Sequence, residues 1–228
     1  MTDIKKIGII GGSGALGSAL AHRFIKESFE VTIGSRSPEK VISKISESDK
    51  DLGLQNLKIQ EIAQTASESE LIFLTVPFAA HQKTVQVIQP YVQGKIVVDT
   101  TVPLVPPKVA RVQLPETGCV ARMTQEILGN DVHVVSALHN VAATALAKSE
   151  TPDGEVMVFG NNKEARETVI QLISKISLKG WHCGSIDNAV VAESLTPVLI
   201  FMNKFYNFKG SGIKICLLYT SPSPRDDE

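Results

Sequence analysis

The chain has 228 residues, 43% hydrophobic and 21% charged, which is enough for one large α/β domain and a small second one. Its net charge of −1 argues against nucleic acid or an anionic membrane as the main partner. The sequence has no apolar stretch of the roughly 20 residues that span a bilayer, and its N-terminus lacks a signal-peptide pattern, so we predict a cytoplasmic location and no membrane partner.

The first predicted element is a short apolar strand that enters a glycine-rich loop. Ile7 to Gly17 reads I-G-I-I-G-G-S-G-A-L-G, with Gly12, Gly14 and Gly17 at the G-x-G-x-x-G spacing. An amphipathic helix follows, and then a second strand at Glu30–Gly34. This context predicts a dinucleotide site, with the pyrophosphate at the helix N-terminus, although a purely structural glycine turn is the alternative.

The end of the second strand distinguishes NADP from NAD. An NAD site usually has a carboxylate there to bind the ribose hydroxyls, but this chain has Ser35, Arg36 and Ser37, followed by Lys40. A hydroxyl, a guanidinium and an ammonium would bind the extra phosphate of NADP. We therefore predict NADP(H); a solvated basic turn is the alternative.

Further elements of an α/β sheet follow in chain order. The pattern predicts strands at Leu57–Gln60, Leu71–Val76, Lys95–Asp99 and His133–Ser136, and helices at Pro38–Ser46, from Glu61, around Val85 and Ile88, and over residues 119–129. Because parallel sheets bind ligands at the carboxyl ends of their strands, we expect Val76–Phe78 and Asp99–Pro103 to line the cofactor cleft. Simple turn chemistry would also explain both segments.

The second half predicts a smaller unit. A strand at Val156–Phe159 precedes helices at Lys163–Ile176 and Asn188–Phe205, the latter with a kink at Pro197. Glu193, early in that helix, is expected to bond backbone rather than substrate. We predict an NADP-binding domain over residues 1–143, a small C-terminal domain over 144–215, and a disordered or non-native tail over 216–228.

The cysteines and histidines give no sign of a metal site. Cys119, Cys183 and Cys216 are far apart in the sequence, and the five histidines have no ligand-like spacing. We predict a protein without metal.

The collected motifs resemble those of the NADPH-dependent coenzyme F420 reductases, also called F420H2:NADP oxidoreductases. The resemblance runs from Ile7 to Ile215. Besides the glycine loop and Gly34-Ser35-Arg36, it rests on Val97 to Leu104 (V-V-D-T-T-V-P-L), Ser136 to His139 (S-A-L-H), Glu193 to Pro197 (E-S-L-T-P) and Gly212 to Ile215 (G-I-K-I).

The resemblance implies a Rossmann-type, doubly wound, mostly parallel sheet with a small α-rich C-terminal domain, paired as a homodimer. Its co-substrates would be NADP(H) and the deazaflavin coenzyme F420. The implied cofactor-binding residues are Gly12, Ser13, Gly14, Leu16, Gly17, Ser35, Arg36, Lys40, Val76, Pro77 and Ala143. His139 and Val141 would contact the deazaflavin, with His139 as an orienting residue and no catalytic residue assigned with certainty.

The implied reaction passes a hydride between the two cofactors, which supply the reactivity themselves. This agrees with a sequence that shows no obvious catalytic Lys/Asp pair. Two alternatives stay open at this point. One is an NADP-dependent reductase of a flavin or a small organic substrate, and the other is a non-catalytic NADPH-sensing protein with the same fold.

Overall fold

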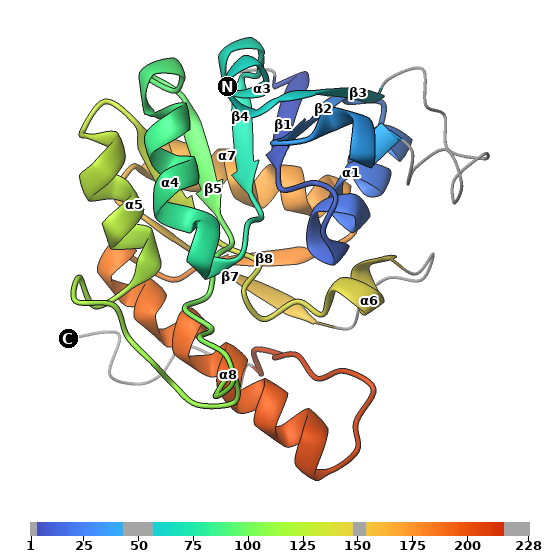
Figure 1. Cartoon of the computed structure of the whole chain (residues 1–228). Helices are drawn as coiled ribbons and strands as arrows, with labels where there is room; N and C mark the ends of the chain where they lie inside the picture. Colours follow the sequence, from blue (N-terminus) through green and yellow to red (C-terminus); the bar gives the residue numbers. More distant parts are fainter. Residues whose placement is uncertain (1–3, 43–56, 148–153, 217–228) are drawn as a thin grey trace, which may run out of the picture.

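A computed structural model describes residues 4–42, 57–147 and 154–216. Its centre is an eight-stranded sheet with helices on both faces (Figure 1). The strands are β1 (Lys6–Ile10), β2 (Glu30–Ser35), β3 (Leu57–Glu61), β4 (Leu71–Leu74), β5 (Ile96–Asp99), β6 (His133–Ser136), β7 (Glu155–Gly160) and β8 (Lys179–His182). The helices are α1 (Ala15–Lys26), α3 (Ile62–Glu68), α4 (Phe78–Ile88), α5 (Val120–Leu128), α6 (Ala143–Ala147), α7 (Lys163–Lys175) and α8 (Ala189–Phe205), with short 3₁₀ helices η2 (Gln89–Tyr91) and η3 (Ile186–Asn188).

The strand order is β3-β2-β1-β4-β5-β6-β7-β8. The first six strands are parallel, β7 runs antiparallel to β6, and β8 is parallel to β7. The order changes direction between β1 and β4, which is the place where doubly wound sheets bind ligands. The predicted Rossmann-type, mostly parallel sheet is confirmed.

Each face of the sheet has its own hydrophobic core. On one face, Leu20 and Phe24 of α1 and Val169 of α7 pack against apolar strand residues. On the other face, Val85 of α4 and Ala192 of α8 do the same. Burial on both sides explains why β4 reads as an unbroken apolar run rather than an alternating one.

Several predicted boundaries differ from the structure. β4 ends at Leu74 and not at Val76, and the two residues that follow it, Thr75 and Val76, line a pocket. β8 and α6 were not expected. β8 is partly exposed and contains a glycine, and α6 has only five residues, so neither produces a clear periodic signal.

Two other predictions concern residues that are only partly described. Residues 38–42 of the expected helix at 38–46 are helical, and the remainder lies outside the described residues. The predicted tail at 216–228 also lies outside them, except for Cys216. Pro197 stands inside α8, where a kink stays a prediction.

The segment after residue 154 is joined to the main sheet. β7 pairs with β6, and β8 pairs with β7, so the sheet crosses the predicted domain boundary without a break. A division into two units at residues 143 and 144 stays a prediction. Among the described helices, none has both the length and the apolar character needed to cross a membrane.

Candidate functional site

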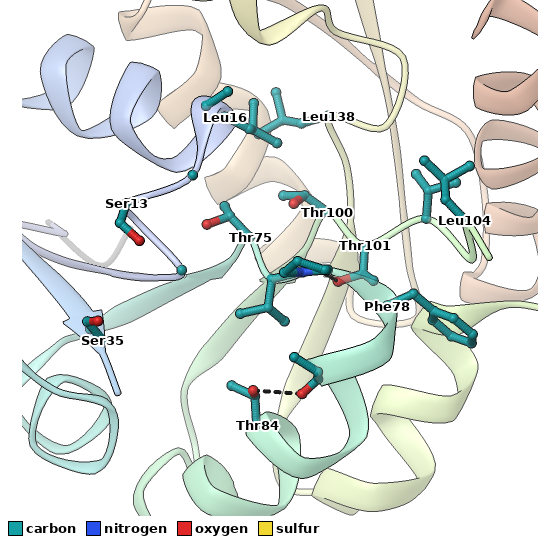
Figure 2. A pocket seen from close by; sticks show the side chains of 18 of the residues that line it. Ser13, Leu16, Ser35, Thr75, Phe78, Thr84, Thr100, Thr101, Leu104 and Leu138 are labelled. Atoms are coloured by element: carbon teal, nitrogen blue, oxygen red, sulfur yellow. Dashed lines mark hydrogen bonds between the residues drawn. The ribbon is translucent and has the colours of Figure 1, made fainter. Parts of the chain in front are cut away.

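A pocket of about 630 Å³ opens at the carboxyl edge of the sheet (Figure 2). One part of its wall comes from the glycine loop after β1 and from the end of β2. The other part comes from the loops that follow β4, β5 and β6. The fold therefore brings the two predicted halves of a dinucleotide site, which are far apart in the sequence, to a single cavity.

The glycine loop is shaped by a residue that the spacing did not single out. Gly11 adopts a φ of 88°, lines the pocket, and donates its N–H to the carbonyl of Gly34 at 3.1 Å. Gly12 and Gly17 pack behind the loop, because a Cβ on Gly17 would lie 2.6 Å from the Cα of Gly12. Because Gly11 and Gly12 are adjacent, the sequence does not indicate which of the two makes the turn.

The first turn of α1 is suited to an anion. Gly14 caps the helix without a side-chain hydrogen bond, and no acidic residue stands in the first turn. The N–H groups there have no intrahelical partners, so they and the positive end of the helix dipole favour a negative group. Ser13 and Gly14 line the pocket at this point.

The end of β2 gives the pocket a hydroxyl and a cation. Ser35 and Arg36 both line it, and the Ser35 Oγ accepts a hydrogen bond from the N–H of Ser37 at 3.1 Å. Glu61, the register partner of Ser35 on β3, is not part of the lining. Among the described residues, no carboxylate lines the pocket.

The far end of the pocket is mainly apolar and carries one histidine. His139 is buried, and its Nδ1 has no hydrogen-bond partner among the described residues. Its Nε2 lies 3.4 Å from the Oγ of Ser136. Burial lowers the pKa of His139 to about 4, so the ring is neutral at physiological pH and can share a hydrogen bond with a ligand.

Helix α8 holds this end of the pocket in place. The Thr196 hydroxyl donates to the carbonyl of His139 at 2.9 Å. Glu193, one turn earlier, is 1% exposed and accepts hydrogen bonds from the N–H groups of Val120 and Ala121 at 2.8 and 3.1 Å. Glu193 therefore bonds backbone, as expected, but at the start of α5 rather than in its own helix.

Most of the predicted site residues meet in the pocket. Those that line it are Ser13, Gly14, Leu16, Ser35, Arg36, Val76, Pro77, His139 and Val141. Gly12, Gly17, Lys40 and Ala143 do not line it, and a role for any of these residues in binding stays a prediction. The lining that sequence reasoning missed includes Gly11, Thr75, Thr84 and Leu104.

A metal site is not evident in the part of the chain that the structure describes. Within residues 4–42, 57–147 and 154–216, no group of three or more His, Cys, Asp or Glu side chains could hold an ion.

Comparison with known proteins points to one group of enzymes. Residues 6–103 match the family model described as "NADP oxidoreductase coenzyme F420-dependent". The F420-dependent NADP reductase of Methanocaldococcus jannaschii is 35% identical over 219 residues, which cover 92% of this chain and 97% of that protein. The reductase of the same name from Methanothermobacter thermautotrophicus is 30% identical, over 93% of this chain and 95% of that protein.

Solved structures agree with the fold. A crystal structure from Arthrobacter sp. FB24, described as a candidate F420-dependent NADP reductase, has a TM-score of 0.77. It is 22% identical and covers 94% of this chain and 100% of that one. Given the matches at 30–35% identity over nearly the full length of both partners, the chain belongs to the family of F420-dependent NADP reductases.

Proposed function

We propose that this protein transfers a hydride between NADP(H) and coenzyme F420. The observation that carries the proposal is a single pocket with a phosphate-binding character at one end and a buried neutral histidine at the other. Its similarity to proteins named F420-dependent NADP reductases supports the same reaction. When both cofactors are bound, they supply the chemistry, since the nicotinamide C4 and the deazaflavin C5 exchange the hydride directly.

The residues at the glycine-loop end fit a dinucleotide that carries a 2′-phosphate. A Cβ on Gly14 would lie only 3.3 Å from the carbonyl of Gly11, so glycine keeps this turn open for close approach by a pyrophosphate. The uncapped first turn of α1 would bind that anion. Ser35 and Arg36 would hold the 2′-phosphate, with the guanidinium as the charged donor.

The residues at the other end would orient two flat rings and exclude water. Val76, Pro77 and Leu138 offer apolar walls, and the polar groups beside them include Thr100, Thr101 and His139. Hydride transfer depends on distance and alignment, so rigid walls matter more than an acid or a base. This role for the protein agrees with a lining that contains neither lysine nor carboxylate among the described residues.

Steady-state turnover tests the proposal against its alternatives. Purified protein and NADPH are mixed separately with oxidised F420, FMN and a cyclic imine. We expect rapid reduction of F420 and little or none of the other two. Preferential reduction of FMN or the imine would favour the small-substrate reductase, and NADPH binding without turnover of any acceptor would favour the sensor.

Replacing His139 with alanine is expected to raise the KM for the deazaflavin and to leave the KM for NADPH nearly unchanged. His139 follows β6, which the strand order separates from β2 and its Ser35 and Arg36, and its neutral ring can orient a ligand without giving up a proton. Single-turnover rates from pH 5 to 8 should show no titration from His139, because its pKa of about 4 lies below that range.

The opposite result for His139 would be easy to recognise. Loss of an essential general acid typically costs 10²- to 10⁴-fold in rate. A rate loss of about a thousandfold, together with a titration present only in the wild type, would make His139 a proton donor and would contradict the orienting role.

We further propose that the protein is a homodimer, as its resemblance to the family implies. Phe201, Phe205, Tyr206 and Phe208 at the end of α8 are each at least half exposed and contact one another. A contiguous exposed aromatic surface is typical of an interface. Sedimentation equilibrium should give a dimer for the wild type and a smaller species for Phe205→Glu, whereas a wild-type monomer at micromolar concentration would contradict this proposal.

A cytoplasmic location and the absence of a nucleic-acid partner stay predictions.

A further inference from the structure

Three polar side chains are buried together behind the wall of the pocket. Asp99 ends β5, His81 lies on α4, and Thr124 lies on α5; their exposed fractions are 1%, 0% and 0%. The His81 Nε2 lies 2.8 Å from the Asp99 Oδ2, which also accepts a hydrogen bond from the Thr124 hydroxyl. None of the three lines the pocket itself.

Burying these three polar side chains in the protein core has a cost in desolvation free energy. The hydrophobic core on this face of the sheet includes Leu74, Val85 and Val97, and the buried Glu193 carboxylate is near enough to Asp99 for the two groups to repel each other. Removing a carboxylate such as that of Asp99 from water costs several kcal/mol, and well-packed apolar residues often serve stability equally well. Because of this desolvation cost, we look for a role of the three side chains other than stabilising the fold.

Asp99 connects the cluster to the pocket through its second oxygen. The Asp99 Oδ1 accepts a hydrogen bond from the N–H of Thr101 at 2.9 Å, and Thr101 lines the pocket. The neighbouring Thr100 is fixed as well, because its hydroxyl donates to the carbonyl of Leu74 at 2.9 Å. Figure 2 shows Thr100 and Thr101 side by side in the centre of the pocket wall.

His81 connects the cluster to a second part of the same wall. It lies on α4, one turn after Pro77 and Phe78, both of which line the pocket. The bond from His81 to Asp99 therefore fixes the start of α4 relative to the end of β5. Thr124 adds a tie to α5, which Glu193 in turn holds against α8.

Asp99 is suited to this task because it stays ionised. Burial alone would raise the pKa of Asp99. The hydrogen bond and electrostatic attraction of His81, together with hydrogen bonds from the Thr124 hydroxyl and the Thr101 N–H, outweigh burial and hold this pKa below its ordinary value. A carboxylate accepts hydrogen bonds at both oxygens, so it can hold the Thr101 loop and the two helices at the same time.

We propose that Asp99, oriented by His81 and Thr124, is a positioning residue for hydride transfer, which sets the wall formed by Pro77, Phe78, Thr100 and Thr101 against the reacting rings. The inference rests on the proposed function, since it assigns the reacting half of the cofactors to this wall. It differs from a purely structural role in one respect. A small shift of this wall should slow the reaction while leaving the adenosine end of the site, at Ser35 and Arg36, unchanged.

Thr124→Val is the discriminating variant, because it removes one buried hydroxyl at nearly constant shape and Thr124 is not itself part of the pocket lining. At saturating NADPH and F420 it should lower the single-turnover rate between about 10- and 100-fold, since a misplacement of 1 Å can cost that much. The Kd of 2′,5′-ADP, which probes only the adenosine end, should stay within about twofold. Thr124→Ser, which keeps the hydroxyl, should recover most of the rate.

Thr65→Val is the matched control. Thr65 is 0% exposed on α3, and its hydroxyl donates to the carbonyl of Glu61 at 3.0 Å without lining the pocket. It should lose stability as Thr124→Val does but keep the wild-type rate. If Thr124→Val also loses only stability, or if its affinity for 2′,5′-ADP falls in parallel with its rate, the positioning role is wrong.

A second measurement needs no acceptor. The fluorescence of bound NADPH reports the surroundings of the reduced nicotinamide, so its emission should change in Thr124→Val and return in Thr124→Ser. Unchanged emission in Thr124→Val would contradict the positioning role. Failure of the wild type to reduce F420 would instead reject the proposed function, and the emission comparison would still decide whether the cluster positions the nicotinamide.

Discussion

Arg36→Ala is expected to weaken NADPH binding by roughly 10- to 150-fold, which corresponds to the 1.5–3 kcal/mol of a charge-assisted hydrogen bond. Arg36 lines the pocket at the end of β2, beside Ser35, where no carboxylate among the described residues lines the wall. NADH lacks the 2′-phosphate, so its affinity should hardly change. Isothermal titration with both cofactors measures the two effects side by side.

Arg122→Ala provides the control for Arg36. Arg122 is also an exposed guanidinium, but it lies on α5, pairs with Glu126 and Asp187, and does not line the pocket. Its loss should leave both affinities unchanged. Equal losses of NADPH and NADH affinity in Arg36→Ala would show that Arg36 does not bind the 2′-phosphate.

Glu193→Gln is expected to change how the free energy of unfolding depends on pH. Burial raises the pKa of Glu193 from 4.5 to about 8; the N–H groups of Val120 and Ala121 partly offset this effect, and the Asp99 carboxylate adds to it. Between pH 4.5 and about 8, the folded protein holds a proton on Glu193 more tightly than the unfolded chain does. The contribution of Glu193 to stability is therefore present at low pH and is lost as pH rises towards 8.

Glutamine keeps one acceptor oxygen and cannot ionise, so it resembles the protonated acid. From pH 5 to 8 the stability of Glu193→Gln should rise relative to the wild type, by at most about 1.4 kcal/mol per pH unit, the limit for one proton. Denaturant unfolding at each pH measures this difference. Glu126→Gln, at an exposed site on α5, should keep the wild-type slope. A constant or opposite difference for Glu193→Gln would show that the buried carboxylate is ionised in the folded protein.

Local patterns in the sequence predicted the parts of the structure that depend on local physics. The glycine spacing from Gly12 to Gly17 predicted the loop, because only residues without a side chain can pack that closely. The apolar run at β4 predicted a strand buried on both faces. Ser35 and Arg36 were identified as pocket residues because the end of β2 has a fixed relation to the glycine loop in this fold.

Features that depend on long-range pairing could not be predicted in the same way. Glu193 bonds the N–H of Val120, 73 residues away, and nothing in either local sequence specifies that contact. The same holds for His81 and Thr124, which meet Asp99 only when α4 and α5 pack together. Gly180 packs against the side chain of Ile173, 7 residues earlier on α7, but in the sequence this glycine weakened the signal for β8.

Isotope transfer is the most direct test of hydride exchange within this pocket. NADPH deuterated at C4, prepared separately in its two stereochemical forms, is mixed with oxidised F420 and the wild-type protein in a single turnover. Direct transfer predicts that one form places its deuterium on C5 of the reduced deazaflavin, where a carbon-bound hydrogen does not exchange with water, and that the other form retains it. The proposed function would be contradicted if the reduced deazaflavin contained only solvent hydrogen whichever form of deuterated NADPH was used. Oxidation of NADPH without reduction of F420 would also contradict it.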